Sequence, residues 1–219
     1  MNTNRSVLWR VFVKDWYMAR WFTVGTLVLG AVALAIASLG PSGAYSAMIL
    51  IIVALIMQGC MLTMYGVVTE RKERATLFTL SLPISTVQHA AIRAVALITA
   101  YLFPCLILAA AGLILAGTSF IPAGLIPISV LTWLFLLDLF LVLLGVALTS
   151  DSEGWTVATL VVTNTSVSFF FYFVLKIPGV LSTLRGPVPV WSAAILEIVA
   201  VELAAIAIIA AVTLARLAR

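Results

Sequence analysis

The fold of this chain is decided by an uncharged stretch at residues 21–69, WFTVGTLVLGAVALAIASLGPSGAYSAMILIIVALIMQGCMLTMYGVVT. It contains two apolar runs, at residues 21–39 and 45–68, separated by the turn-forming sequence GPSG at residues 40–43. A helix needs about 20 mainly apolar residues to cross the hydrocarbon core of a bilayer, because each residue advances it by about 1.5 Å. Each run is long enough, so the stretch predicts two membrane spans joined by a tight turn.

Four further runs of similar length and composition follow, at residues 94–116, 125–149, 155–175 and 191–215. Over the whole chain, 64% of the residues are hydrophobic and only 9% are charged, and the mean hydropathy is +1.24. Such a chain cannot cover itself with enough polar surface to be a soluble globular protein. We therefore predict an all-α, multi-pass membrane protein with six transmembrane helices in one domain, residues 1–219.

The positions of the cationic side chains predict how these spans are oriented. Lys and Arg in short loops stay on the cytoplasmic side of a membrane. Counted on alternate sides, only Lys176 and Arg185 fall on one side, and the other ten share the opposite side (Arg5, Arg10, Lys14, Arg20, Arg71, Lys72, Arg74, Arg93, Arg216 and Arg219). Both termini and the loop at residues 69–93 are therefore expected in the cytoplasm. The net charge of +4 is attributed to this topology and to membrane lipid, not to nucleic acid.

Residues 4–20 have the spacing of an amphipathic helix. Four apolar side chains recur at i, i+3, i+4 and i+7 (Trp9, Phe12, Val13 and Trp16), and basic side chains between them can face lipid headgroups. We expect an interfacial helix that lies in the membrane surface before the first span. The alternative is a helical extension of that span into the cytoplasm, because Trp and Arg also mark ordinary span ends.

The loop between the second and third spans carries the densest charge cluster of the chain, ERKERATLFTLSLPIS, at residues 70–85. Glu70 and Arg74 are four residues apart, in the order that stabilises an exposed helix. Leucines and a phenylalanine follow until Pro83, which ends the helix, and Ser85 with Gln88 then forms a capping box for the next helix. The exposed apolar side chains fit either the lipid interface or a groove on a cytoplasmic partner.

This stretch resembles the signature loop of the membrane subunits of type-2 ATP-binding-cassette (ABC) exporters, in which an acidic and basic pair, a Thr-Leu and LSLPIS follow the second of six spans. The order of elements along the whole chain is also similar to that family. One departure is Ala75, because family members often carry Gly before the Thr. The resemblance implies a non-catalytic permease half that pairs with a second permease subunit, as a homodimer or heterodimer, in the bacterial inner (plasma) membrane.

In that family the loop forms a coupling helix that seats in a separate cytoplasmic ABC ATPase subunit. Carried over by position, the implied ATPase-coupling residues are Glu70, Arg71, Lys72, Glu73, Arg74, Thr76, Leu77, Phe78, Leu80 and Pro83. The chain has no G-x-x-x-x-G-K-[ST] phosphate loop, so ATP and Mg²⁺ are expected in the ATPase, and no cofactor, metal or catalytic residue is expected here. Movement at the loop would tilt the second and third spans. Pro104, inside the third span, predicts either a moving kink or a static bend.

Polar residues inside the predicted spans are the candidates for a translocation path: Asp138, Asn164, Glu197 and Glu202. An ionised carboxylate at the membrane centre costs at least about 2.5 to 3.5 kcal/mol, so such groups usually face a cavity or a partner. We expect the three acids to be protonated, hydrated or hydrogen-bonded to hydroxyls of TNTSVS at residues 163–168. They line a path for a cationic or polar substrate, or they hold helices together. Asp138 and Glu202 also define a functional alternative, an ion- or proton-coupled carrier without an ATPase.

Overall fold

The computed structural model describes residues 3–69, 85–118, 122–150, 152–181 and 188–217, and all regular structure in them is helical. The elements are α1 (Thr3–Ala37), α2 (Pro41–Thr63), the π-helix η1 (Met64–Thr69), α5 (Thr86–Gly117), α6 (Leu125–Thr149), α7 (Glu153–Val174), the short α8 (Pro178–Leu181) and α9 (Ala193–Leu217). Six helices in this part of the chain are long and apolar enough to cross a membrane. The prediction of an all-α chain with six such helices is confirmed.

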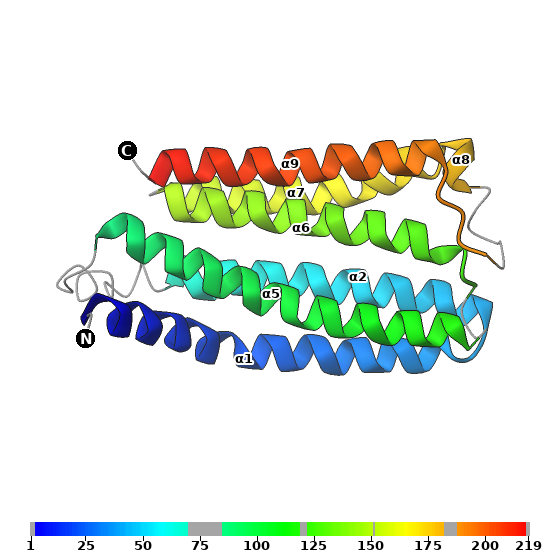
Figure 1. The fold of residues 1–219 in the computed structure, drawn as a ribbon, viewed down its shortest axis with the longest axis horizontal. Coiled ribbons are helices and arrows are strands. Elements are labelled where there is room, and N and C mark those ends of the chain that lie inside the picture. Colours follow the sequence, from blue (N-terminus) through cyan, green and yellow to red (C-terminus); the bar gives the residue numbers. More distant parts are fainter. Residues whose placement is uncertain (1–2, 70–84, 119–121, 151, 182–187, 218–219) are drawn as a thin grey trace.

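The long helices run side by side along the molecule in two groups of three (Figure 1). In one group α1 packs against both α2 and α5, and in the other α6 packs against both α7 and α9. α2 also contacts α6, which joins the groups. The beginning of α1, the end of η1, the beginning of α5 and the end of α9 all lie at one end of the bundle (Figure 1). We call this the terminal end, because both chain termini are there.

The first helix differs from the prediction. Residues 4–20 do not form a separate helix before the first span, because α1 continues without a break from Thr3 to Ala37. Residues 3–24 contain neither Gly nor Pro, so nothing in the sequence interrupts the hydrogen bonds of the helix there. Val11, Asp15 and Ala19 are buried, at spacings of four residues, whereas Trp9 of the predicted apolar stripe is exposed.

The predicted GPSG turn is confirmed, and it sets α1 and α2 antiparallel (Figure 1). Gly40 has φ of +118°, a backbone conformation that side chains disfavour. Pro41 is the first residue of α2, where its missing N–H needs no partner. At Gly43 an added Cβ would lie 2.2 Å from the carbonyl oxygen of Ile36, so the close approach of the two chain segments requires glycine.

A stacked aromatic pair lies at the boundary between the two groups of helices. The rings of Tyr101 on α5 and Phe140 on α6 have centroids 4.3 Å apart and planes at 11°. Both belong to a buried apolar cluster with members from α1, α2, η1, α5 and α6. A second buried cluster joins the beginnings of α2, α6 and α9 to the end of α7 and to α8. The groups are therefore held together at both ends of the bundle.

Pro104 interrupts the hydrogen-bond ladder of α5. Because proline has no backbone N–H, the carbonyl of Ala100, four residues earlier, loses its donor within the helix. Gln58 on α2 replaces it by donating from Nε2 to the oxygen of Ala100 at 3.0 Å, and Gln58 is only 2% exposed. Neighbouring helices commonly supply the missing bond beside a transmembrane proline. This contact fixes the third span to the second at the proline and favours the static bend.

The replacement of Gln58 by Leu tests this link. We expect a loss of about 1 to 3 kcal/mol in stability, because the buried carbonyl of Ala100 is left without a donor. Pro104→Ala restores the backbone N–H, so Gln58→Leu should cost clearly less in that background. Thermal unfolding of the four proteins of this double-mutant cycle, followed by circular dichroism in detergent, measures the coupling. An equal cost in both backgrounds would show that Gln58 does not compensate for Pro104.

Candidate functional site

The predicted ATPase-coupling residues, from Glu70 to Pro83, lie outside the described residues, but the structure describes both chain segments that flank them. The predicted capping box on the far side is confirmed. Gln88 donates its backbone N–H to Oγ of Ser85 at 3.2 Å, and its side-chain oxygen accepts from the backbone N–H of Ser85 at 3.3 Å. α5 therefore begins at Thr86, earlier than the predicted span at residues 94–116. On the near side, the π-helix η1 ends at Thr69, directly before these residues. π-Helical segments occur frequently at functional sites.

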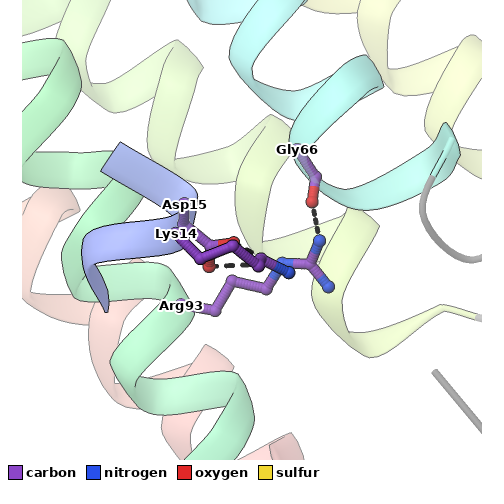
Figure 2. Close-up of polar contacts among 4 residues, drawn as sticks. All are labelled: Lys14, Asp15, Gly66 and Arg93. Atoms are coloured by element: carbon purple, nitrogen blue, oxygen red, sulfur yellow. Dashed lines mark hydrogen bonds and ion pairs between the residues drawn. The ribbon is translucent and has the colours of Figure 1, made fainter. Parts of the chain in front are cut away.

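A cluster of polar groups joins three elements at the terminal end of the bundle (Figure 2). Arg93 on α5 donates from its guanidinium group to the carbonyl oxygen of Gly66 in η1. Its Nε lies 3.9 Å from a carboxylate oxygen of Asp15 on α1, and Nζ of Lys14 lies 3.3 Å from the other oxygen. Arg93 is 5% exposed and Asp15 is 4% exposed. We call Lys14, Asp15, Gly66 and Arg93 the basal clamp.

The basal clamp gives a backbone carbonyl a donor and pairs two buried charges, with Nε of Arg93 and Oδ2 of Asp15 interacting as charges at 3.9 Å without a hydrogen bond between them. The last carbonyls of a helix have no donors within that helix, and Gly66 lies in the final residues of η1. Asp15 and Arg93 neutralise each other, and removal of one partner from such a buried pair typically costs about 3 to 5 kcal/mol. Both chain segments that flank residues 70–84 are therefore fixed to α1, so a force applied to that stretch reaches three helices.

Sequence reasoning did not predict the basal clamp. It used Arg93 and Lys14 only for topology and headgroup contacts, and it did not single out Asp15. A signal was present, because Asp15 is the only acid among the first 69 residues. Its partner could not be identified from the sequence, since Arg93 is 78 positions away and meets Asp15 only when α1 packs against α5.

Two of the four predicted path residues are buried at the contact between α6 and α9. Asp138 on α6 is 7% exposed and Glu202 on α9 is 5% exposed, and they follow by seven residues Leu131 and Ile195, which belong to one buried cluster. Within the described residues, Oδ1 of Asp138 and both carboxyl oxygens of Glu202 have no hydrogen-bond partner. We call Asp138 and Glu202 the carboxyl pair.

The other two predicted path residues lie elsewhere. Glu197 is exposed on the surface of α9. Asn164 on α7 is half-buried and donates from Nδ2 to the carbonyl oxygen of Leu160 at 2.8 Å. It lines a cavity of about 30 Å³, together with Cys60 and Tyr101. The four predicted residues therefore do not form one continuous polar surface within this chain.

One alternative expected from the sequence was that hydroxyl groups of residues 163–168 donate to the intramembrane acids. Three of these hydroxyl groups donate elsewhere. The hydroxyls of Thr163, Thr165 and Ser166 donate to backbone carbonyls four residues earlier in α7, at 2.9, 2.8 and 2.8 Å. Ser and Thr side chains in helices often make this bond, because that carbonyl is the nearest acceptor. For these three residues the expected bond to a carboxyl group is wrong.

An apolar cavity of about 150 Å³ lies between α1, α2, α5 and α6. Leu34, Met48 and Leu108 are among its lining residues. Its two hydroxyl groups, on Ser129 and Thr132, both donate to backbone carbonyls of α6. The cavity therefore suits a hydrocarbon group such as an acyl chain better than a polar group.

Comparison of the chain with protein-family models, with curated proteins and with solved structures gives no match. The features that point to a function are the sequence ERKERATLFTLSLPIS, the arrangement of the six long helices, the basal clamp and the carboxyl pair.

Removal of Arg93 tests the basal clamp. Arg93→Gln should lower stability by about 3 kcal/mol or more, because Asp15 would remain buried without its counter-charge. Lys14→Gln is the matched control, since it removes the same charge from a side chain that is 41% exposed, and it should cost less than about 1 kcal/mol. Asp15→Asn should recover part of the loss in the Arg93→Gln protein. Thermal unfolding in detergent measures these differences, and equal costs for the two single substitutions would contradict the assignment.

Proposed function

We propose that this chain is the membrane-spanning permease half of an ATP-driven ABC transporter of the type-2 exporter kind, in the bacterial inner membrane. The observation that carries the proposal is the stretch at residues 70–85, whose sequence resembles the coupling loop of that family. η1 ends and α5 begins at the terminal end of the bundle, as expected if the loop and both termini face the cytoplasm (Figure 1). In this proposal ATP and Mg²⁺ bind to a separate ATPase subunit.

The basal clamp supports a mechanical role for that stretch. When the ATPase subunits close on ATP, movement of the coupling helix passes directly to η1 and α5. The contacts of Arg93 with Asp15 and Gly66 carry the same movement to α1. α2, which continues into η1, also contacts α6. Packed helices respond to such a force as rigid bodies, so the path alternates between inward and outward opening.

The exposed surface of α9 supports pairing with a second permease subunit. Of the six candidate spans, α9 has the smallest buried share, 6%. Its exposed face carries alanines at i, i+4, i+7 and i+11 (Ala200, Ala204, Ala207 and Ala211). Small residues let helices approach closely in a membrane, where packing rather than the hydrophobic effect drives their association. This stripe favours α9 as part of the contact between the two permease halves.

Two substitutions in the coupling stretch test the proposal. Tagged protein purified from its native membranes should carry an ATPase subunit with a phosphate loop. Leu77→Glu and Glu73→Arg should each abolish its retention and its ATP-driven transport, because they place a wrong charge in the contact, while the helical circular dichroism spectrum stays unchanged. Leu39→Glu is the matched control, because Leu39 is 80% exposed and lies between the end of α1 and the beginning of α2, which are at the opposite end of the bundle. Normal retention and transport after Leu77→Glu, or loss of both after Leu39→Glu, would contradict the coupling role.

The carboxyl pair supports a second candidate function, an ion- or proton-coupled carrier that needs no ATPase. A carrier of this kind uses intramembrane acids as its coupling sites. The purified chain, reconstituted alone into liposomes, should then take up substrate under an imposed pH gradient. Uptake should disappear in Asp138→Asn, while Glu197→Gln, an exposed acid on α9, should leave it unchanged. Gradient-driven uptake without an ATPase would replace the exporter proposal, and its absence would reject the carrier.

A further inference from the structure

The carboxyl pair is the least expected feature of the membrane-spanning part, because two acids are buried there on helices that pack against each other. We propose that Asp138 and Glu202 form a proton-binding site in which one of the two carboxyl groups is protonated and the pair keeps a single negative charge. This site goes beyond the proposed transport function and does not rest on it, since it follows from the packing of α6 against α9.

The packing of α6 and α9 holds the pair in place. Both helices begin near α8 and run to the terminal end, so they are parallel (Figure 1). On one side of the pair, Ile195 of α9 belongs to the same buried cluster as Leu131 of α6. On the other side, Thr213 of α9 is so close to α6 that a Cβ on Gly145 would lie 2.6 Å from its hydroxyl oxygen. The carboxyl pair therefore lies between two points at which α6 and α9 are packed together.

No described basic side chain on the packed elements is placed to neutralise the pair. Arg93 is held in the basal clamp, and Arg216 lies 14 residues after Glu202, about 21 Å further along α9. Lys176, beyond the end of α7, donates to Tyr172. The other described titratable side chains on α6, α9 and the elements packed against them are Tyr45, Cys60, Tyr65, His89, Tyr101, Cys105, Glu153, Tyr172 and Glu197.

A bound proton lowers the free-energy cost of burying two carboxyl groups at this contact. Each ionised carboxylate near the membrane centre costs at least about 2.5 to 3.5 kcal/mol, and two like charges at one site disfavour each other further. Protonation of one group removes one charge and gives that group an O–H donor. Like-charged carboxyl groups that interact in this way titrate as a pair.

The size of the ligand also favours a proton. The two cavities described above are lined by residues other than Asp138 and Glu202. An organic cation would need such a space beside the pair, whereas a proton needs none. Separation of α6 from α9 would admit water and allow the proton to leave, and renewed contact would require it to return. The protonation of the pair and the packing of these two helices are therefore linked.

Infrared spectroscopy of the folded protein tests the proposal without the need for a reagent to enter the site. The protein is placed in ether-linked lipid, which has no ester carbonyl, at about pH 8, where ordinary carboxyl groups are ionised. Wild-type protein should show the C=O stretch of a protonated carboxylic acid, with a shift in D₂O. The band should be lost in both Asp138→Asn and Glu202→Gln, because the remaining carboxyl group no longer has a like charge near it that favours its protonated form. Glu197→Gln, the matched control on α9, should keep it.

Each other outcome overturns the proposal. A wild-type spectrum without the acid band at this pH shows that both groups are ionised, whether or not added sodium changes the spectrum. A band that survives Asp138→Asn shows that Glu202 holds its proton alone, and a band that disappears in Glu197→Gln assigns it to the wrong residue. If a variant fails to fold, as judged by circular dichroism, the wild-type protein still decides the matter. Its acid band must then be present in the folded state and lost on denaturation at the same pH.

Discussion

The absence of water from the bilayer is the constraint on which the rest of this structure depends. A polar group within the hydrocarbon region has to find its partner inside the protein, because unsatisfied donors and acceptors there cost several kcal/mol each. Most described polar side chains in the long helices meet this demand locally. The hydroxyls of α7 bond to carbonyls of their own helix, and Gln58 supplies the donor that Pro104 lacks. Polar contacts between helices therefore occur where the backbone or a charge requires them.

The basal clamp follows from the same constraint, and it also restricts how the helices around it can move. Arg93 and Asp15 are too deeply buried to be neutralised by water, so each fixes the position of the other. Because Arg93 also binds the last residues of η1, the three helices around residues 70–84 cannot move independently at that end. In the exporter proposal, the coupling loop needs such a base, since a loop attached to loosely held helices would transmit little movement.

The carboxyl pair is a place where the described residues do not meet the constraint. Asp138 and Glu202 are about as buried as Asp15 and Arg93 of the basal clamp, but they have the same charge and three oxygens without a donor in the described part of the chain. A structure selected only for stability would not retain this arrangement, because an apolar pair of similar volume avoids the cost. The cost is accounted for if the site exchanges a proton as α6 and α9 move. In the exporter proposal this would link the helices far from the ATPase to the pH of the surrounding water.

The sequence by itself determined that the chain is helical, which segments are long and apolar enough to span a membrane, and where the turn at Gly40 and the capping box at Ser85 lie. These features depend on residues only a few positions apart, so they can be predicted from composition and local spacing.

The sequence did not determine that α1 is one helix, because Trp and Arg occur both at interfaces and at span ends. Only the tertiary structure decided that Asp15 meets Arg93, that Gln58 meets Ala100 and that Glu202 rather than Glu197 is buried with Asp138 where α6 packs against α9. These partners are between 42 and 78 positions apart, and their meeting depends on which face each helix turns toward its neighbour. In a helix that is apolar on all sides, that face is set by packing and is not marked by an alternation of polar and apolar residues.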